Sequence, residues 1–430
     1  MTDPGPRGGD RGAGGAYDTL SADEKTFFTT ARDVFAEVDS VSGTIEEGKG
    51  LGPTFNGNSC AQCHAEPDVG GSSPHPALGH VRMANPQVGL ATLDRAAGGA
   101  QKVPPFIAAD GPIREARFVH NPDGSDDGGV HGLYTIAGRT DAPGCKLAQP
   151  DFAKEVAHNN VIFRIPTALF GLGLLESIPE DELEANLAAN NDAKTGCGVG
   201  GTFNRSGNDG TITRFGWKAQ NKSLLVFAGE AYNVEQGVSN ELFANERSAV
   251  SGCVFNPGPE DATDTTTGGA PDTTMFAAFM RLSQDPQPTT ASPSELRGQK
   301  LFGTKADPGV GCVLCHTDTL TSGSVRYTGM SGVAVHAYTD LAIHHMGTKL
   351  ADNVTQGAAT GDMFRTAPLW GVGKRIFFLH DGRSGPTNGG LVNAILAHGS
   401  RGSEASATIR KFTALPAADQ QAIINFLRSL

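Results

Sequence analysis

The sequence predicts a mainly α-helical protein of two similar domains, with long irregular loops and small β insertions. A helix-start signal followed by a Cys-x-x-Cys-His pentapeptide occurs once in each half of the 430-residue chain. This recurrence indicates an internal repeat. Glycine and proline, at 57 and 25 residues, place much of the backbone in turns and irregular connections.

The first copy of the repeat follows a glycine-rich segment, residues 1–19, whose low complexity predicts a mobile terminus. Ser21 and Glu24 then have the spacing of a capping box ahead of several hydrophobic residues, so we expect a helix to start there. The pentapeptide follows at residues 60–64. The first domain is predicted to span residues 20–290.

The second copy begins at Ser292 and Glu295, which repeat the capping-box spacing with Pro293 at the first helical position. Its pentapeptide occupies residues 312–316. The chain closes with hydrophobic residues on one face of a predicted helix, namely Ala422, Ile423, Phe426, Leu427 and Leu430. We expect the second domain over residues 291–430, after a stretch rich in proline, glycine and threonine.

The charge balance excludes several classes of partner. The formal net charge is −12, and the chain has no basic run. This argues against nucleic acid and anionic membrane surfaces as partners. No stretch approaches the roughly 18 to 20 apolar residues that a spanning helix needs, so no membrane span is expected.

Each pentapeptide has the residues that attach a haem covalently. The two motifs comprise Cys60, Cys63 and His64, and Cys312, Cys315 and His316. Two thiols three positions apart can add to the two vinyl groups of haem, and the histidine that follows can ligate the iron. A zinc knuckle or a redox dithiol uses the same residue types, but zinc sites place their ligands within one folded unit. The sequence therefore predicts two covalently bound haem c groups, one in each of two cytochrome c-like domains.

Covalent haem attachment normally takes place on the export side of the membrane, so we expect a periplasmic protein. No signal peptide is recognised, and we interpret the glycine-rich start as a trimmed terminus whose leader is absent from this chain. Cys145, Cys197 and Cys253 remain outside the motifs. An exported protein permits one disulfide among them. We favour Cys197 with Cys253, since both lie in glycine-flanked loops, but the sequence leaves the pairing open.

Six short stretches outside the pentapeptides carry a family resemblance. Three of them are Phe-Arg-Thr-Ala-Pro-Leu-Trp at 364–370, Phe-Leu-His-Asp-Gly-Arg at 378–383 and Ala-Ile-Leu-Ala-His-Gly at 394–399. These resemble the bacterial di-haem cytochrome c peroxidase superfamily. The other three, residues 169–179, 214–219 and 338–347, are similar to its di-haem oxidoreductase branch, also called thiol oxidoreductases. The resemblance covers the chain from about residue 45 onward.

The resemblance implies a sixth iron ligand for each haem. His398 falls where the peroxidases have the distal ligand of the electron-entry haem, usually methionine, which implies a low-potential His316/His398 haem. The alternative for His398 is a solvated histidine at a helix end. At the N-terminal haem, His80 resembles the displaceable distal histidine, with His75 as a close rival, and either can be a surface loop residue instead.

Roles are also predicted for two further histidines, His344 and His380. His380 is expected to fix a haem propionate or a loop rather than to ligate iron. His344 is expected to be structural, with ligation as its alternative. Spacing alone does not rank them.

The resemblance also implies residues for chemistry and for electron transfer. Peroxide cleavage needs a base that moves a proton between the two oxygens, and Glu176 is the predicted catalytic carboxylate. Its alternative is an acidic residue that favours a helix start. Trp217 and Trp370 are predicted to shorten the electron path between the haems, and the alternative for each is a large core side chain. Relatives hold a calcium ion, but no local acidic loop specifies one here.

The leading functional prediction is a di-haem oxidoreductase that reduces hydrogen peroxide at the His64 haem, with electrons entering at the His316 haem. A small redox protein, such as a basic cytochrome c or a cupredoxin, is the expected donor, since the negative charge of this chain would attract it. One alternative is a non-catalytic electron-transfer cytochrome in the periplasm. The other is a di-haem enzyme that oxidises a different substrate.

Overall fold

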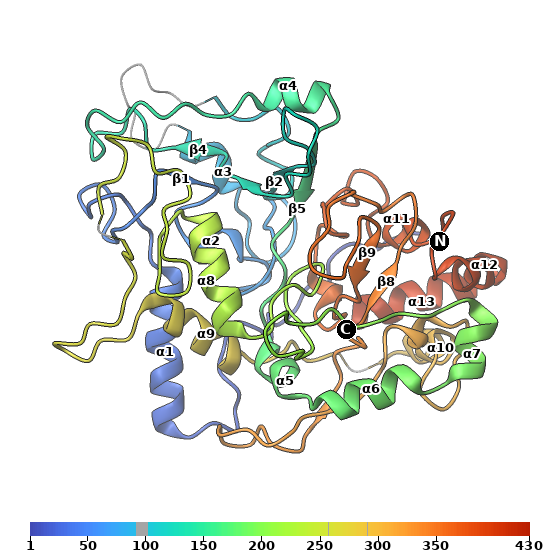
Figure 1. The fold of residues 1–430 in the computed structure, drawn as a ribbon. Coiled ribbons are helices and arrows are strands. Elements are labelled where there is room, and N and C mark those ends of the chain that lie inside the picture. Colours follow the sequence, from blue (N-terminus) through green and yellow to red (C-terminus); the bar gives the residue numbers. More distant parts are fainter. Residues whose placement is uncertain (92–101, 257, 290) are drawn as a thin grey trace. The chain divides into compact units, whose positions relative to one another are not determined.

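The computed structural model of the chain forms two compact units, each of which holds one pentapeptide (Figure 1). The described residues are 1–91, 102–256, 258–289 and 291–430. The His64 unit comprises residues 25–169 and 224–282. The His316 unit comprises residues 1–24, 170–223 and 283–430.

The His64 unit combines helices with two small antiparallel sheets. Its helices are α1 (Ala22–Ala36), α2 (Cys60–Cys63), α3 (Pro86–Leu90), α4 (Phe152–Ala157), α8 (Leu224–Glu235) and α9 (Asp272–Leu282). Strands β2 (Glu115–Phe118), β3 (Val130–His131) and β5 (Val161–Arg164) form a sheet in the order β3-β2-β5. Strand β1 (Thr54–Phe55) pairs with β4 (Tyr134–Thr135).

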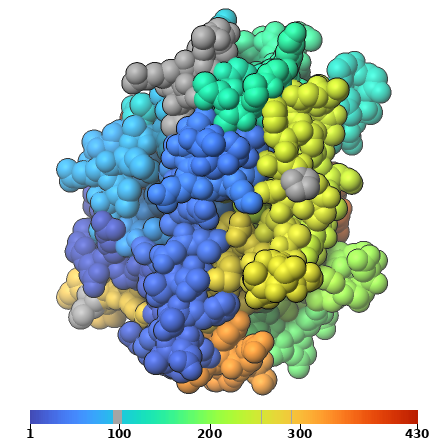
Figure 2. Space-filling view, turned by 90° about the vertical axis from the view of Figure 1, so that its left-hand side faces the viewer, coloured from blue at the N-terminus to red at the C-terminus, as the bar shows by residue number. Residues whose placement is uncertain are grey.

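Aromatic rings join α1 to α9 in the His64 unit. The rings of Phe35 and Phe279 stack with their centroids 4.5 Å apart, and Phe28 stacks on the same Phe279 at 5.6 Å. Figure 2 shows α1, in blue, beside the chain around residues 240–280, in yellow, on one face of this unit. Burial of three large rings supplies the apolar contact that fixes α1.

The His316 unit is richer in helices. They are α5 (Leu172–Ser177), α6 (Glu180–Ala188), α7 (Asn191–Cys197), α10 (Pro293–Phe302), α11 (Gly390–Ala397), α12 (Ser406–Ala414) and α13 (Ala417–Ser429). Two 3-10 turns are η1 (Cys312–Leu314) and η2 (Val372–Lys374). Strands pair as β6 (Leu320–Thr321) with β7 (Ala334–Val335) and β8 (Ile343–His345) with β9 (Met363–Arg365).

The expectation of a mainly α-helical fold holds in part. Helices account for 29% and strands for 12% of the chain, so irregular backbone exceeds both together. The long irregular loops and small sheets were expected from the abundance of glycine and proline. Helices are the larger share of the regular structure, but loops connect most of them.

The predicted helix starts are confirmed at both copies of the repeat. The amide of Ser21 donates to the Glu24 carboxylate at 2.8 Å, and the amide of Glu24 donates to the Ser21 hydroxyl at 3.3 Å. Ser292 and Glu295 form the same reciprocal pair at 2.5 and 3.3 Å. Each box satisfies two backbone N–H groups that would otherwise lack partners at a helix start.

The predicted apolar face of the last helix is also confirmed. Its residues are buried in the core of the His316 unit, where Phe302 and Phe426 meet with centroids 5.4 Å apart. Helix α10 approaches α13 most closely at Gly298. A Cβ atom at this position would lie 1.9 Å from the carbonyl oxygen of Ala422.

Gly298→Ala is therefore expected to destabilise the protein by about 2–3 kcal/mol, because the added methyl group forces two packed helices apart. The change is measured as a loss of free energy of unfolding in denaturant. Gly196 lies in α7 with nothing within 4 Å of an added Cβ, so Gly196→Ala is the matched control. It should be neutral or stabilising by up to about 1 kcal/mol. Equal effects of the two changes would contradict the packing assignment.

The predicted domain boundary at residue 290 was wrong in one respect. Residues 170–223 were expected in the first domain but belong to the His316 unit. Thr202 and Ile343 exchange two backbone hydrogen bonds of 3.0 and 2.8 Å, which joins this segment to β8. Such pairing between residues far apart in sequence has no local signal. Residue 290 itself lies outside the described residues.

Lys218 is the strongest single link between this segment and the rest of the His316 unit. Its side chain is fully buried, and its ammonium pairs with Asp352 at 3.2 Å. It also donates to the carbonyl oxygens of Thr360 and Met363 at 2.8 and 2.9 Å. A buried charge must be paired in this way, so Lys218 fixes the segment to the loop before β9.

The N-terminal segment, predicted as mobile over residues 1–19, instead packs on the His316 unit. The carboxylate of Asp3 accepts two hydrogen bonds of 2.7 Å from Arg428. It also accepts a 2.7 Å hydrogen bond from the amide of Leu391, in the first turn of α11. A carboxylate at a helix start is favourable, and this one ties the segment to α11 and α13.

The favoured disulfide was wrong as well. Cys145 and Cys253 are bonded, with Cα atoms 4.6 Å apart, and both lie in the core of the His64 unit. Cys197 is a buried free thiol at the end of α7. Glycine-flanked loops indicate a turn but not which cysteines meet in space, which is what a disulfide requires. In the described parts of the chain, no helix has both the length and the apolar character to cross a bilayer.

Candidate functional site

The second pentapeptide forms a tight turn, and its two cysteines and its histidine line one pocket. Cys312 begins η1, and the amide of His316 donates to the carbonyl of Cys312 at 3.0 Å. Gly311, just before the turn, has φ +108°, a left-handed conformation that favours glycine. A Cβ there would also lie 2.8 Å from the Thr408 hydroxyl, so the turn lies close against α12.

A pocket of about 1430 Å³, including its open mouth, lies against this turn. Its walls are mainly apolar and include Phe302, Leu369, Val372, Phe378, Leu391 and Ile395. The lining of the pocket therefore suits a mostly apolar group.

His316 and His398 both line this pocket, and each ring is fixed by its Nδ1 atom. His316 Nδ1 lies 2.9 Å from the carbonyl oxygen of Tyr338, and His398 Nδ1 lies 2.8 Å from that of Ala394. When the proton of a neutral imidazole is on Nδ1 and donated to a carbonyl, Nε2 carries no proton and its lone pair can bind a metal. Desolvation lowers the pKa of His316 to about 4 and also lowers the pKa of His398, so both rings are neutral. Neutral imidazoles oriented in this way can ligate iron.

Two buried arginines in the pocket have N–H groups without partners. They are Nη1 of Arg365 and Nε and Nη2 of Arg375. Desolvation lowers the pKa of each guanidinium to about 10, which leaves both charged at neutral pH. Buried cations need anionic partners. The two propionates of a haem supply two carboxylates, so these residues fit that group.

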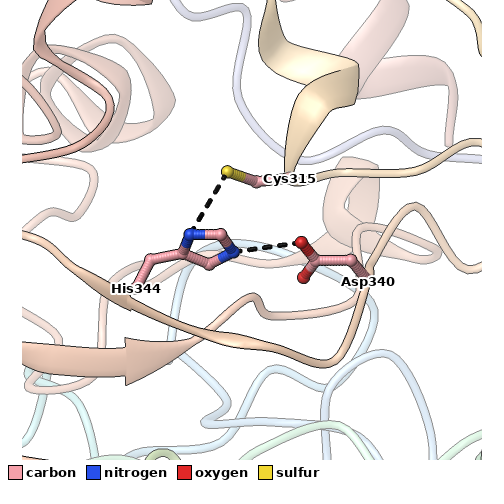
Figure 3. Close-up of side chains that lie close together, drawn as sticks. All are labelled: Cys315, Asp340 and His344. Atoms are coloured by element: carbon pink, nitrogen blue, oxygen red, sulfur yellow. Dashed lines mark hydrogen bonds and ion pairs between the residues drawn. The ribbon is translucent and has the colours of Figure 1, made fainter. Parts of the chain in front are cut away.

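His344 also lines the pocket, beside Cys315, but its ring has other partners (Figure 3). Its Nε2 lies 3.0 Å from the Asp340 carboxylate, and its Nδ1 lies 2.7 Å from the Glu404 carboxylate and 3.8 Å from the Cys315 sulfur. Burial alone would lower the pKa of His344, but the charges of Cys315 and Asp340 raise it well above its ordinary value. Carboxylates lie within hydrogen-bond distance of both nitrogens, which supports the structural role expected for His344.

The first pentapeptide has a similar histidine arrangement in the His64 unit. His64 Nδ1 lies 2.9 Å from the carbonyl oxygen of Thr167 and 3.1 Å from that of Gly71. Desolvation lowers the pKa of His64 to about 4. The side-chain amide of Gln236 donates to the Cys60 sulfur at 3.2 Å. The ring is again neutral and oriented, as a proximal ligand requires.

His80 is held by Glu66, two residues beyond His64. Its Nδ1 lies 3.1 Å from the Glu66 carboxylate, which also accepts the amides of His80 and Val81. His75 Nδ1 accepts from the amide of Ala77 at 3.1 Å. His80 stays our prediction for the distal position, with a carboxylate partner of the kind that orients metal-bound histidines.

Comparisons with known proteins were made for the whole chain. No curated protein matches it. Hydrazine synthase of Kuenenia stuttgartiensis, solved under 20 bar of xenon, is 16% identical over 37% of this chain and 55% of its own, with a TM-score of 0.24. A MauG-like protein associated with microbial copper homeostasis is 18% identical over 37% of this chain and 52% of its own, with a TM-score of 0.25. The chain thus spans about half the length of each structure.

The family described as "Di-haem oxidoreductase, putative peroxidase" matches residues 120–430, well over half of the chain. The chain belongs to this family. The predicted resemblance is thereby confirmed, and haem is the cofactor of this di-haem oxidoreductase. The match contains the second pentapeptide and all six stretches that carried the resemblance, but it begins after the first pentapeptide at 60–64.

The two tryptophans of the di-haem oxidoreductase both lie in the His316 unit. Trp217 lines the pocket and meets His380 edge to face, with ring centroids 6.4 Å apart. His380 in turn stacks on Phe364 at 4.2 Å, so it packs among aromatic rings at the pocket wall. Trp370 is buried against Gly171, where an added Cβ would lie 2.5 Å from its ring.

Glu176 lies near the end of α5 in the His316 unit, whereas His64 belongs to the other unit. The main-chain carbonyls around it, those of Leu175, Glu176 and Ile178, all accept from the guanidinium of Arg214. This buried arginine fixes the backbone at Glu176. The acid–base role of Glu176 stays a prediction.

Calcium also stays a prediction for this di-haem oxidoreductase. Among the described residues, the cluster whose His, Cys, Asp or Glu ligand atoms lie within 4.8 Å of one another is Cys315, Asp340 and His344. Sulfur and imidazole are not the oxygen ligands that calcium prefers.

Sequence reasoning missed Arg365, Arg375 and the Asp340–His344–Glu404 cluster. Arg365 stands in the 364–370 stretch quoted for the resemblance, so the one charged residue in an otherwise uncharged stretch was the available signal. That signal does not separate a buried guanidinium from an exposed one.

Proposed function

We propose that this di-haem oxidoreductase is a periplasmic enzyme that reduces hydrogen peroxide, using two covalently attached haems. Electrons enter at the His316/His398 haem, and peroxide is reduced at the His64 haem. Peroxide takes up two electrons and two protons, its O–O bond breaks, and two waters form. The observation that carries the proposal is the pair of neutral, oriented imidazoles, His316 and His398, on one apolar pocket.

Different residues of the His316 pocket would have different roles in binding the haem. Cys312 and Cys315 would form the thioether bonds, and His316 and His398 would ligate the iron. Arg365 and Arg375 bind the propionates, and the apolar walls exclude water. When bound, haem supplies the redox-active iron that accepts and passes on single electrons.

At the catalytic end, Cys60, Cys63 and His64 would hold the second haem, and His80 would be its displaceable second ligand. Glu176 moves a proton from the near to the far oxygen of peroxide. Trp217 and Trp370 carry electrons between the sites. The chain's net charge of −12 favours a small basic electron donor, a cytochrome c or a cupredoxin.

The test uses the full chain matured with haem. Its mass should exceed that of the bare chain by two haems, since both attachments are covalent. Absorption and spin-resonance spectra through a redox titration should show one low-spin bis-histidine haem and one haem that becomes high-spin and consumes peroxide after half-reduction. Two haems that stay low-spin at every potential and never react with peroxide would make the protein an electron carrier. Spectral activation without peroxide turnover would favour a different oxidised substrate.

Glu176→Gln should lower peroxide turnover by roughly 100-fold, because the amide cannot accept and return a proton. Haem content and both reduction potentials should stay close to wild type. Glu184→Gln is the control, since Glu184 is an exposed glutamate on the neighbouring helix α6 that pairs with Arg205 at 2.7 Å. Wild-type turnover in Glu176→Gln would remove Glu176 from the mechanism.

A further inference from the structure

Two glutamates from different elements meet beside the first pentapeptide. Glu115 begins β2, and Glu235 ends α8. The main-chain carbonyl of Glu235 accepts the amides of Asn56 and Gly57 at 2.6 and 3.0 Å. The residue after it, Gln236, donates to the Cys60 sulfur. The end of α8 is therefore built into the haem-attachment site.

The carboxyl groups of Glu115 and Glu235 share a hydrogen bond, which requires one proton between them. Glu115 is 14% exposed and accepts from Arg117 Nε at 2.6 Å. Desolvation by itself would raise the pKa of Glu115, but the charge of Arg117 outweighs it, so the pKa of Glu115 lies below its usual range. Desolvation and the charge of Glu115 raise the pKa of Glu235 well above its usual value. A proton bound by the pair is thus favoured on Glu235 rather than on Glu115.

Charged groups surround this pair from every neighbouring element. They are Arg117 on β2, Arg164 on β5, Glu230 on α8 and Arg247 in the loop after α8. The Glu235 carboxyl group acts electrostatically on both Cys60 and Cys63, so it lies close to the place where the haem is attached. Electrostatic influence is mutual, so a change of charge at the attached cofactor must act on Glu235 in return.

We propose that the Glu115–Glu235 pair is a proton store for the His64 site, which binds a proton when that site is reduced and releases it when the site is oxidised. One electron comes from the donor protein and one proton from water, and the carboxylate becomes a carboxylic acid. A ferrous site carries one positive charge fewer than a ferric site, which favours the protonated acid. The inference rests on the haem attachment in the proposed function, but not on peroxide as the substrate.

The test is a spectroelectrochemical titration of the full two-haem protein at a series of pH values. In the wild type, the potential of the His64 haem should fall as pH rises, because the proton stabilises the reduced form. Glu235→Gln keeps a hydrogen-bond donor to Glu115 but cannot titrate, so this dependence should disappear while the His316 haem is unchanged. The infrared band of a protonated carboxyl group that changes on reduction should disappear with it.

Three further variants keep the test decisive. Glu47→Gln, on the surface of the same unit, should behave as wild type. Glu115→Gln removes the charge that favours the proton on Glu235, so the pH-dependent range should move to lower pH, and it carries the test if Glu235→Gln does not fold. Asp39 also acts on Cys60, and burial raises the pKa of Asp39 to about 8. Asp39→Asn should leave the dependence in place.

A pH-independent wild-type potential, or a full dependence retained in Glu235→Gln, would overturn the inference. Loss of the dependence in Asp39→Asn alone would assign the proton to Asp39 instead. Peroxide turnover is measured separately. If the protein shows the pH dependence but never reduces peroxide, the proton-store proposal stands and the proposed substrate is wrong.

Discussion

His398→Ala should abolish the low-spin signal of the C-terminal haem and replace it with a high-spin, five-coordinate signal. His398 lies on the pocket wall with Nδ1 held by the Ala394 carbonyl, which leaves Nε2 for iron. Changing only the hydrogen-bond partner of a metal ligand typically costs about 10- to 100-fold, so loss of the ligand should lower donor-driven turnover by at least that factor. Spin-resonance spectra and reduction kinetics measure the two effects.

Controls for this change come from the other histidines. His345→Ala removes an exposed histidine that pairs with Asp362 at 2.8 Å and should leave the spectra unchanged. His398→Met should keep the haem low-spin but raise its potential, since thioether ligation favours the ferrous state. Added imidazole should restore the low-spin signal in His398→Ala. An unaltered spectrum in that variant would show that another group ligates the iron.

Lys218→Ala should lower the free energy of unfolding by about 3–5 kcal/mol. The change leaves the buried carboxylate of Asp352 without its ammonium partner and removes the ammonium donor from two main-chain carbonyls. Removal of one partner from a buried ion pair has costs of that size. Denaturant unfolding of the haem-loaded protein, followed by a haem band of the His316 unit, measures the loss.

Lys222→Ala is the matched control, because Lys222 pairs with Asp209 at 2.8 Å at a site where both side chains are at least a third exposed. Such surface pairs contribute less than about 1 kcal/mol. The double variant Lys218→Met with Asp352→Leu removes both charges together and should recover much of the loss. A Lys218→Ala protein as stable as the Lys222→Ala protein would show that the segment 170–223 is held by other contacts.

Local features of this fold were predictable from the sequence, and the reason is that their causes are local. Both capping boxes and the apolar face of α13 depend on residues within one or two helical turns of each other. The haem motifs are equally local, since five consecutive residues supply the thiols and the proximal imidazole. His398 needed the family resemblance to be singled out, and the structure places it on the pocket that holds His316.

The features that sequence reasoning missed depend on residues far apart in the chain. In the sequence, nothing distinguishes Lys218 from an ordinary surface lysine, because its partner Asp352 meets it only in the folded chain. Cys145 and Cys253 are 108 residues apart, and the residues around each cysteine do not indicate which other cysteine it bonds. The N–H groups of Arg365 and Arg375 that lack partners become meaningful only when both side chains are seen to be buried on one pocket wall.

The chain passes between the two compact units four times, and this limits how the protein can be dissected. Separating the halves at residue 290 would strip the His316 unit of residues 170–223, and with them Lys218 and Trp217. A protease cut between Cys145 and Cys253 would leave both fragments covalently joined until a reductant opened the disulfide. Single-haem variants of the intact chain, rather than isolated halves, are therefore the way to study each iron by itself.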